Sequence, residues 1–382
     1  RIPDLVHSSE IVSSKILMPD KEHILVSCLN PKKHKIWRIS RNNRNIKRLC
    51  STEWAVIVPN DSDDIDYLNA VLEDFFFQYQ MNSYVTGTTN SHQRVKKNDL
   101  LKLKINYNSK SNSLEIGKVH KGFRKLIETS NNIKGIIDQL NQTLFQSLFM
   151  NFDPLKSKIE GKITSDNNQF ISSLFPDSYE NSELGKIPRG WSVKSFGDLC
   201  TLVKGVSYKG KFLDEPGPAL LGMGTIREGG GFRSENVRTY AGPYKEKHVI
   251  RPGGIYTALT SQDGYLIGST ARFPIEYEGF GIATHHVCKI ECQDPHMKEF
   301  LYWFMQTEYF IMHCINFSHG TTVYATKIAD VGRLRLVVPP PSVLEYFHRF
   351  TNSNNQLFSL LNKDDEIFHE SKELFTSKIN YG

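Results

Sequence analysis

Residues 318–330 read Ser-His-Gly-Thr-Thr-Val-Tyr-Ala-Thr-Lys-Ile-Ala-Asp, and this turn decides the fold because the chain contains a version of it twice. The earlier version is Gly87-Thr88-Thr89, with Asp99 after it. Each turn follows an apolar segment with helical spacing and precedes an expected strand and a long helical segment. A unit of sheet plus long helix therefore occurs twice, which is the plan of a protein that reads two sites. The alternative is an old duplication kept only as scaffold.

The two copies align at nearly constant spacing. Four apolar helix positions of the first copy match positions 233 residues later in the second: Leu68 with Leu301, Val71 with Phe304, Leu72 with Met305 and Phe76 with Tyr309. The ends of the long helical segments, 144–147 and 374–377, lie 230 residues apart. The second copy is the complete one, because the first has no counterpart to residues 185–240.

Composition places the chain among soluble globular proteins. Its 382 residues are too many for one core, so two or three domains are expected. The hydrophobic content is 39% and the charged content 23%, and no apolar run approaches membrane-spanning length. The chain begins at Arg1 and not at methionine, so we expect an N-terminal piece to be missing. The net charge of +6 is compatible with a nucleic-acid partner.

Charges are segregated along the first copy. Residues 23–52 contain eight cations and no acid, whereas residues 49–93 contain seven acids and no lysine or arginine. A solvated basic face would explain a shorter run, but a block this one-sided favours a surface for a polyanion such as DNA or RNA. We expect this surface to contact phosphates through Lys32, Lys33, Lys35 and Arg38.

The acidic segment 61–64 suits the start of a helix, because acids there lie at the positive end of the helix dipole. The apolar residues after it have helical spacing, and we expect one core stripe: Leu68, Val71, Leu72, Phe75, Phe76 and Tyr79. The matching helix begins at Asp294-Pro295, an N-cap followed by proline at the first helical position. Strands are expected at 100–105 and 333–338.

A long helix closes each copy. A helix of about 30 residues is about 45 Å long. One apolar stripe is expected on each, formed by Leu126, Ile133, Ile137, Leu140, Leu144 and Leu148 on the first and by Phe350, Leu357, Leu361, Phe368 and Phe375 on the second. So narrow a stripe needs a partner helix, and the natural partner is the other copy packed antiparallel. A helix bundle of another origin is the alternative. The intervening segment 151–191 is expected to be loop and linker.

Motifs that resemble reactive sites do not meet their requirements. Segment 205–211 matches the start of a phosphate-binding P-loop, but Phe212 stands where magnesium binding needs Ser or Thr. The glycines of 222–231 indicate a hairpin loop. Cys288 and Cys292 raise the question of zinc, but segment 284–290 has the pattern of a buried strand, and reduced thiols of a cytosolic protein are preferred. No nucleophile, base and orienting group occur together, so no catalytic residue or metal ligand is predicted.

Over essentially its whole length, the chain resembles the specificity subunit of Type I restriction-modification enzymes. The motif Leu184-Gly-Lys-Ile-Pro-Arg-Gly-Trp191 is similar to the start of that family's second target recognition domain. Phe152-Asp-Pro154 and Leu174-Phe-Pro-Asp-Ser178 are similar to its linker after the first spacer helix. Segments 320–330 and 338–341 look like the end of a recognition domain. The first copy departs from the family because the opening of its recognition domain is absent or diverged.

The resemblance implies an α+β fold. Two globular target recognition domains, each a mixed β-sheet with helices, would be related by a pseudo-two-fold repeat and separated by two long antiparallel spacer helices that form a coiled coil. The implied boundaries are 1–118 for an N-terminally incomplete first recognition domain, 119–150 for the first spacer helix, 151–183 for the linker, 184–341 for the second recognition domain and 342–382 for the second spacer helix.

The resemblance also implies a role without catalysis in this chain. Each recognition domain would read one half of a bipartite sequence in double-stranded DNA. The spacer helices would dock two modification (methyltransferase) subunits, and translocating restriction subunits would complete the nuclease. S-adenosylmethionine, ATP and Mg are expected on those partners, and no cofactor is expected in this chain. Such a complex would be cytoplasmic in a prokaryote.

Base-edge contacts specify a sequence, whereas phosphate contacts position the protein. Loop residues are the candidates for both: His92, Gln93 and Arg94 in the first domain, and Thr225, Arg227, Gln262, Asp263, His319, Thr321, Tyr324 and Lys327 in the second. Gln suits adenine, Arg suits guanine and Asp can accept from cytosine. A solvated loop side chain is the alternative at each position.

Two other classes of function stay open. One is a stand-alone DNA- or RNA-binding regulator, which would not co-purify with a methyltransferase subunit. The other is a nuclease with an unrecognised acidic site, which would cleave DNA as an isolated chain in the presence of metal. The bases recognised cannot be read from the sequence, because no simple residue-to-base code applies to such loops.

Overall fold

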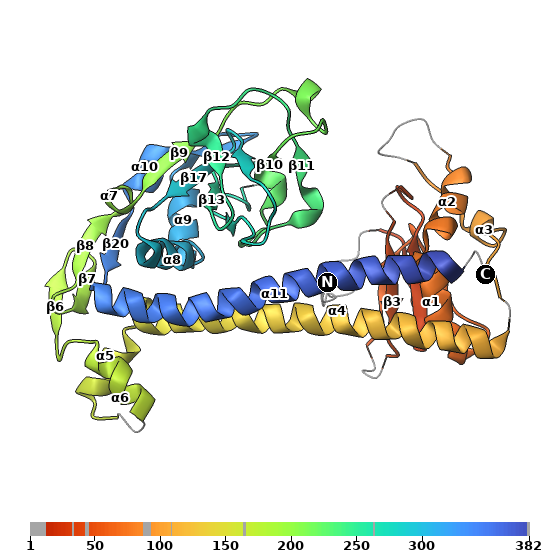
Figure 1. Cartoon of the computed structure of the whole chain (residues 1–382), viewed down its shortest axis with the longest axis horizontal. Helices are drawn as coiled ribbons and strands as arrows, with labels where there is room; N and C mark the ends of the chain where they lie inside the picture. Colours follow the sequence, from red (N-terminus) through yellow and green to blue (C-terminus); the bar gives the residue numbers. More distant parts are fainter. Residues whose placement is uncertain are drawn as a thin grey trace. The chain divides into compact units, whose positions relative to one another are not determined.

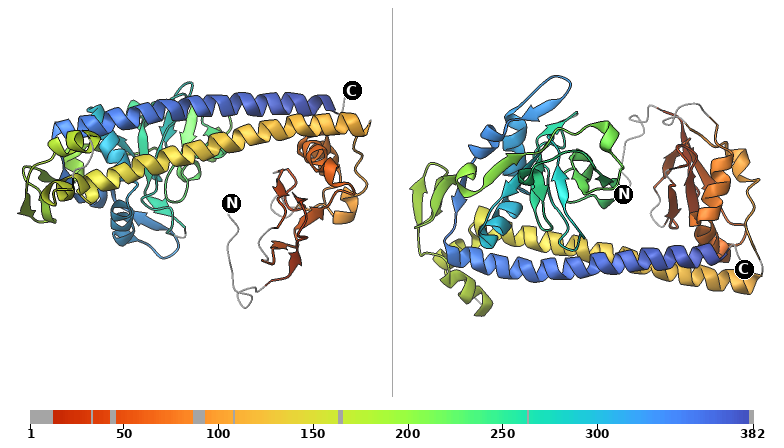
Figure 2. Two further views of the ribbon diagram at one scale, coloured as in Figure 1. Left: turned by 90° about the horizontal axis from the view of Figure 1, so that it is seen from below. Right: turned by 45° about the horizontal axis from the view of Figure 1, so that its top comes forward.

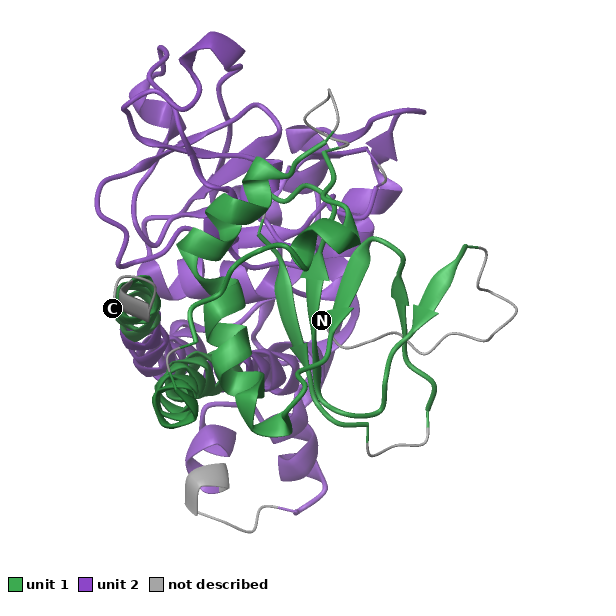
Figure 3. Ribbon diagram, turned by 90° about the vertical axis from the view of Figure 1, so that its right-hand side faces the viewer, with its two compact units in different colours: residues 1–132, 364–382 green, residues 133–363 purple. Residues whose placement is uncertain are grey.

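The computed structural model describes residues 13–32, 34–42, 46–86, 93–107, 109–162, 166–262 and 264–379. The fold is α+β, with several small sheets and two long helices (Figure 1). The chain divides into two compact units: unit 1 holds residues 1–132 and 364–382, and unit 2 holds residues 133–363 (Figure 3). Helices α4 (Lys110–Phe145) and α11 (Pro341–Ile379) contribute to both units.

Unit 1 contains an antiparallel sheet of order β3-β2-β5 and a separate pairing of β1 with β4. Every residue of the central strand β2 is buried, because its two faces enter different apolar cores. The elements are β1 (Lys15–Leu17), β2 (His23–Ser27), β3 (Ile36–Ile39), β4 (Leu49–Ser51), β5 (Trp54–Ile57), α1 (Ile65–Glu73), α2 (Phe75–Ser83) and α3 (Lys97–Leu100).

Unit 2 contains two four-stranded sheets, β11-β10-β16-β12 and β15-β13-β17-β9, with a small sheet β14-β19-β18 and the pairs β20-β8 and β6-β7. Its strands are β6 (Tyr179–Ser182), β7 (Gly185–Pro188), β8 (Ser192–Ser195), β9 (Thr201–Lys204), β10 (Ala219–Leu221), β11 (Arg238–Thr239), β12 (Val249–Ile250), β13 (Ile255–Ala258), β14 (Thr260–Ser261), β15 (Thr270–Arg272), β16 (Gly281–Ala283), β17 (Val287–Glu291), β18 (Ser318–His319), β19 (Tyr324–Thr326) and β20 (Arg335–Val338). Its shorter helices are α5 (Asp153–Ile159), α6 (Asp166–Ser173), α7 (Phe196–Leu199), α8 (Pro295–Phe304), α9 (Glu308–Asn316) and α10 (Ile328–Gly332).

The structure extends the sequence repeat to the strands. In unit 2, β12, β13, β15, β16 and β17 pair as β1, β2, β3, β4 and β5 do in unit 1. The helices after them are divided at matching positions, since Asp74 and Thr307 are 233 residues apart (307 − 74). Both residues are extended, and each side chain accepts a backbone N–H of the following helix. The described part of unit 1 holds no counterpart of β9, β10 and β11, as the shortened first copy predicts.

This division contradicts the prediction of a single aromatic core stripe in the first copy. Asp74 has ψ 147°, so α1 ends there and α2 starts in a new direction. Helix α2 then buries Phe77 and Met81. The predicted core residues on α2 are instead exposed: Phe75, Phe76 and Tyr79. The apolar spacing continues across the break, so periodicity alone did not reveal it.

Helices α4 and α11 lie side by side within each unit (Figures 1 and 2). In unit 2 they run antiparallel: Asn354 donates to Asn141 at 2.6 Å, and Lys134 donates to Asn362 at 3.2 Å. Residue numbers thus fall along one helix as they rise along the other. The predicted antiparallel partner is therefore observed within this unit.

The burial of side chains along these helices differs from the predicted stripes. Ile137 and Leu148 are buried, and the partly buried members are Leu144, Phe350, Leu361, Phe368 and Phe375. The other members are between 37% and 49% exposed, contrary to the prediction: Leu126, Ile133, Leu140 and Leu357. Small polar side chains are buried in their place, among them Ser130, Asn141 and Thr351. The hydrogen bond between Asn141 and Asn354 therefore occupies a place that the prediction filled with leucines.

Two further predictions are wrong. Segment 151–191 is not simply loop, because it contains α5, α6, β6 and β7. Phe152 and Phe175 anchor it by packing on Trp191, with ring centroids 5.5 Å and 5.3 Å apart. The predicted strand at 100–105 is absent, since turns and irregular backbone follow α3. Strand β20 and the N-cap of α8 are confirmed. None of the helices in the described part of the chain has the length and apolar character that crossing a bilayer requires.

Candidate nucleic-acid interface

Unit 2 gathers most of its predicted contact residues around the sheet β14-β19-β18. Ser261 pairs with Tyr324, and His319 pairs with Ala325. This register places the loop after β14 and the turn between β18 and β19 at the same end of the sheet. Four exposed side chains lie at this end: Gln262, His319, Thr321 and Tyr324. Lys327 is exposed beyond the other end of β19, and Asp263 lies outside the described residues.

The backbone at this end is fixed by local bonds. Gly320 has φ +131°, and a Cβ there would lie 2.0 Å from the Val323 carbonyl oxygen, so the turn requires glycine. Thr326 Oγ1 donates to the Cys314 carbonyl at 2.6 Å, which ties β19 to α9. Ser261 Oγ accepts the Gly264 N–H at 3.1 Å and closes the loop after β14. Polar side chains are thus presented on a stiff support.

Unit 1 repeats this arrangement in reduced form. Arg94 forms antiparallel bridges with both Leu29 and Thr86, in the place that Ala325 takes between β14 and β18. Its guanidinium is exposed and pairs with Glu53 at 2.8 Å. A surface ion pair of this kind contributes little stability, so the guanidinium can exchange the carboxylate for a phosphate or a base edge. Two predicted contacts, Lys33 and His92, and the turn 87–89 lie outside the described residues.

The remaining candidates of unit 1 differ in how available their side chains are. Lys32 and Lys35 are exposed in the loop between β2 and β3, next to the bridge of Leu29. Gln93 is half-buried, and its carbonyl accepts the Asn30 N–H at 2.8 Å. The two lysines are therefore the more accessible phosphate contacts.

The Arg38 side chain is only 12% exposed and is engaged within unit 1. It pairs with Glu22 at 3.3 Å and with Asp66 on α1. These carboxylates already neutralise the guanidinium, so the structure does not support Arg38 as a phosphate contact. Arg38 was predicted to contact phosphate because no acid lies near it in the segment 23–52. Its two carboxylate partners, Glu22 and Asp66, lie before and after that segment.

In the glycine-rich loop of unit 2, one predicted contact residue is buried and the other is exposed. Thr225 is only 2% exposed, and its hydroxyl is hydrogen-bonded to the Tyr256 hydroxyl at 2.8 Å, so it cannot reach a base. Arg227 is exposed in the loop, where its N–H donates to the Gly231 carbonyl. The bridge between Ile226 and Phe232 confirms the predicted hairpin loop.

Sequence reasoning missed residues that border this sheet. Tyr265 is 69% exposed in the same loop as Gln262. His286 Nδ1 lies 2.9 Å from Thr260 Oγ1, and the His285 and His286 rings are 3.8 Å apart. Burial, and then the charges of His285 and Lys204, lower the pKa of His286. Tyr265 could have been found, because it follows Gly264 in a loop of polar residues. The contact between His286 and Thr260 depends on strand pairing that the sequence does not show.

The cysteines of unit 2 are poorly suited to nucleophilic or metal chemistry. Burial raises the pKa of Cys200, Cys288 and Cys314 to about 12, so these thiols stay protonated near neutral pH. In the described ranges, no three His, Cys, Asp or Glu side chains gather in a way that could hold a metal ion.

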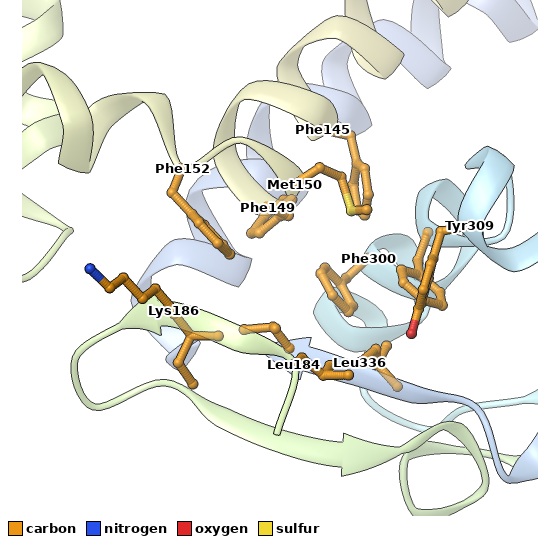
Figure 4. A pocket seen from close by; sticks show the side chains of 12 residues that line it. Phe145, Phe149, Met150, Phe152, Leu184, Lys186, Phe300, Tyr309 and Leu336 are labelled. Atoms are coloured by element: carbon orange, nitrogen blue, oxygen red, sulfur yellow. The ribbon is translucent and has the colours of Figure 1, made fainter. Parts of the chain in front are cut away.

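Unit 2 also contains an apolar pocket of about 210 Å³ (Figure 4). Aromatic and aliphatic side chains line it, among them Phe149, Phe300 and Leu336. Lys186 and Tyr309 are its polar members, and they come from opposite sides of the lining. The lining brings no acid or histidine to these two groups.

Comparison with known proteins gives one relative by sequence. The chain is 24% identical over 304 residues to the Type I restriction enzyme MjaIX specificity subunit of Methanocaldococcus jannaschii. The alignment covers 76% of this chain and 62% of the relative, so the chain spans less than two thirds of that protein's length. This alignment confirms the resemblance to specificity subunits. No protein-family model matches the sequence.

Solved structures of specificity subunits align loosely with this chain. The HsdS subunit from Thermoanaerobacter tengcongensis is 13% identical, with 93% of this chain and 80% of that chain covered and a TM-score of 0.35. The Type I restriction-modification S subunit from M. genitalium is 12% identical, with 95% and 84% covered and a TM-score of 0.48.

Proposed function

We propose that this chain is the DNA sequence-recognition subunit of a Type I restriction-modification complex. The observation that carries the proposal is the 304-residue alignment with a specificity subunit. The internal repeat supports it, because Arg94 takes in unit 1 the bridging place that Ala325 takes in unit 2. Two similar surfaces suit the reading of two half-sites in double-stranded DNA.

The proposal assigns α4 and α11 to the spacer. The finer architecture is then two recognition domains, related by a pseudo-two-fold repeat and joined by an antiparallel coiled coil, with the domain boundaries implied by the resemblance. Helix α4 has 36 residues and α11 has 39. At 1.5 Å per residue they are roughly 55 Å long, enough to hold half-sites about one DNA turn, or about 34 Å, apart.

The exposed apolar residues of the spacer suit the docking of partner subunits. Leu126 and Leu140 on α4 and Leu357 on α11 are each 45–49% exposed. Exposed leucines on a helix that already has a partner favour a further protein contact. We assign these contacts to two modification subunits, with restriction subunits joining them in the cytoplasm of a prokaryote. S-adenosylmethionine, ATP and Mg would act on those partners, and this chain would catalyse nothing.

Methylation mapping tests the proposal directly. Genomic DNA from cells that carry the complete system should show modified bases in one bipartite motif, and the motif should vanish when this chain is deleted. A matched strain lacking only the modification subunit should lose the same motif. Retention of the motif in the strain without this chain would overturn the proposal. If the chain were a stand-alone regulator, deleting it would remove no methylated motif.

Deletion of helical turns tests the spacer assignment separately. Removing one turn from the segment 349–379, with a compensating deletion in α4, should change the tolerated gap between half-sites and leave both half-sites intact. A change in the bases recognised would show that these helices do not act as the ruler.

A further inference from the structure

Residues 204–211, here called the lysine loop, form an exposed basic segment that begins at the end of β9 and includes the glycines and lysines of the P-loop-like stretch 205–211. The loop is held close to β16: Val206 bridges Thr284, and a Cβ on Gly205 would lie 2.2 Å from the Ala283 carbonyl oxygen. The backbone is therefore pinned at its start, and the following side chains point outward. Its exposed members are Lys204, Ser207, Tyr208, Lys209 and Lys211.

A chain of ring and hydrogen-bond contacts joins the lysine loop to the sheet β14-β19-β18. The Tyr208 ring lies 6.1 Å from that of His285, which lies 3.8 Å from that of His286. His286 Nδ1 lies 2.9 Å from Thr260 Oγ1, and Thr260 pairs with Ala325. The lysine loop and the candidate base-reading end of the sheet are thus connected on one unit by direct contacts.

The charge around the lysine loop is positive. Two of the acids that follow it are paired with cations outside the loop: Asp214 pairs with Arg238 at 2.6 Å, and Glu246 pairs with Arg251 at 2.8 Å. Lys204 of the loop also acts on His286, whose pKa is lowered first by burial and then by the charges of His285 and Lys204. Cations interleaved with an exposed tyrosine are typical of a surface that binds nucleic acid.

We propose that the lysine loop, through Lys204, Lys209 and Lys211, is a phosphate-contacting strip that runs beside the base-reading sheet of unit 2. The inference rests on the proposed function, because it names duplex DNA as the partner. The contacts from Tyr208 through His286 to Thr260 hold the strip at a fixed place beside β14. Phosphate contacts there set the register in which Gln262 and Tyr324 meet the groove.

The test measures the salt dependence of binding. The full chain, purified with the subunits that accompany it, is titrated with mixed-sequence duplex DNA at several salt concentrations. Replacing all three lysines with alanine should weaken binding to every sequence and lower the slope of log affinity against log salt by about 2 to 3, since each phosphate contact contributes about 0.9. The matched control removes three exposed cations on and beside β7 and β8, namely Lys186, Arg189 and Lys194, and should leave the slope unchanged.

The outcomes separate the two proposals. Failure of the unaltered protein to bind duplex DNA would overturn the proposed function. Binding with the same slope in the unaltered protein and the triple lysine variant would overturn this inference alone. A second variant, Tyr208→Ala, keeps every charge and should loosen the strip, so it should weaken binding at least twofold with little change in slope. An unchanged affinity for this variant would argue against the ring contacts as the connection.

Discussion

Lys372 Nζ donates to Glu73 Oε2 across 2.8 Å, so that within unit 1 helix α11 holds the carboxylate at the end of α1. His120 Nε2 on α4 lies 3.2 Å from the same oxygen, and Asn69 donates to Oε1 at 2.8 Å. Burial alone would raise the pKa of Glu73, but His120 and Lys372 overcome that effect and hold the pKa well below its usual value. One carboxylate thus joins three helices of unit 1.

Lys372→Met should destabilise unit 1 by about 1–3 kcal/mol, because it leaves a mostly buried carboxylate with fewer partners. The free energy of unfolding in urea measures the loss. Lys118→Met on α4 removes an exposed cation and is the matched control. Adding Glu73→Gln to Lys372→Met should recover part of the loss. Additive effects of the two substitutions would show that the pair is not coupled.

The pair Asn141 and Asn354 sets the register of α4 against α11 in unit 2. Asn354→Ala should cost about 1–3 kcal/mol, because Asn141 is 1% exposed and its Oδ1 would lose its donor. Replacing both residues with leucine should restore stability but broaden the thermal transition, since a buried polar pair specifies one register. Asn352→Ala, at an exposed position of the same helix, is the control. A sharp transition in the double leucine variant would contradict the register role.

Acid should destabilise unit 1 through His34. Burial lowers the pKa of His34 to about 4 from 6.5, although the charge of Glu73 opposes the shift. Because the unfolded chain takes up the proton first, stability is fully present above pH ~6.5 and falls until about pH 4, by at most ~3 kcal/mol. Urea unfolding at a series of pH values measures this slope. His34→Gln should flatten it in that window, and an equal slope in the variant would assign the loss to other groups.

Much of the architecture follows from the repeat, and the failures have physical causes. The Asp294 N-cap was readable because capping depends on a few adjacent residues. The break at Asp74 was hidden, because apolar spacing continues through it while the backbone changes direction. The spacing of leucines along a helix does not show which neighbouring element covers them. The prediction therefore treated positions of α4 as buried that the structure exposes. Burial of small polar residues such as Asn141 depends on a partner 213 positions away (354 − 141).

The sequence predicted which loops form the candidate interface, but it did not predict which of their side chains are free to make contacts. The exposure of the turn 320–324 was predictable, because a glycine turn between strands presents its neighbouring side chains at the surface. Arg38 was misjudged, since its carboxylate partners Glu22 and Asp66 are distant in sequence from the basic block. The contact between His286 and Thr260 joins the turn before β17 to β14, 26 residues apart (286 − 260), and composition does not reveal this contact.

Lys32 and Lys35 should contact phosphates without reading sequence. Replacing both with alanine should weaken binding equally on all duplexes and lower the salt slope by about 2. Lys104 and Lys118 are exposed cations of the same unit, and their replacement should leave the slope unchanged. An altered sequence preference in the Lys32 and Lys35 variant would instead place these side chains at base edges.

Gln262 and Thr225 provide a matched test of base reading in unit 2, because one is exposed at the sheet end and the other is 2% exposed. Gln262→Ala should relax the preference at one position of a half-site, by about 1–3 kcal/mol of discrimination, because an amide pairs well with adenine. Thr225→Val should keep the sequence preference and lower stability by about 1 kcal/mol, because the Tyr256 hydroxyl loses a partner. Selection of bound sequences from a random duplex pool measures the first effect, and urea unfolding measures the second. A changed motif in Thr225→Val, with Gln262→Ala unchanged, would move the reading surface from the end of β14 to the glycine-rich loop.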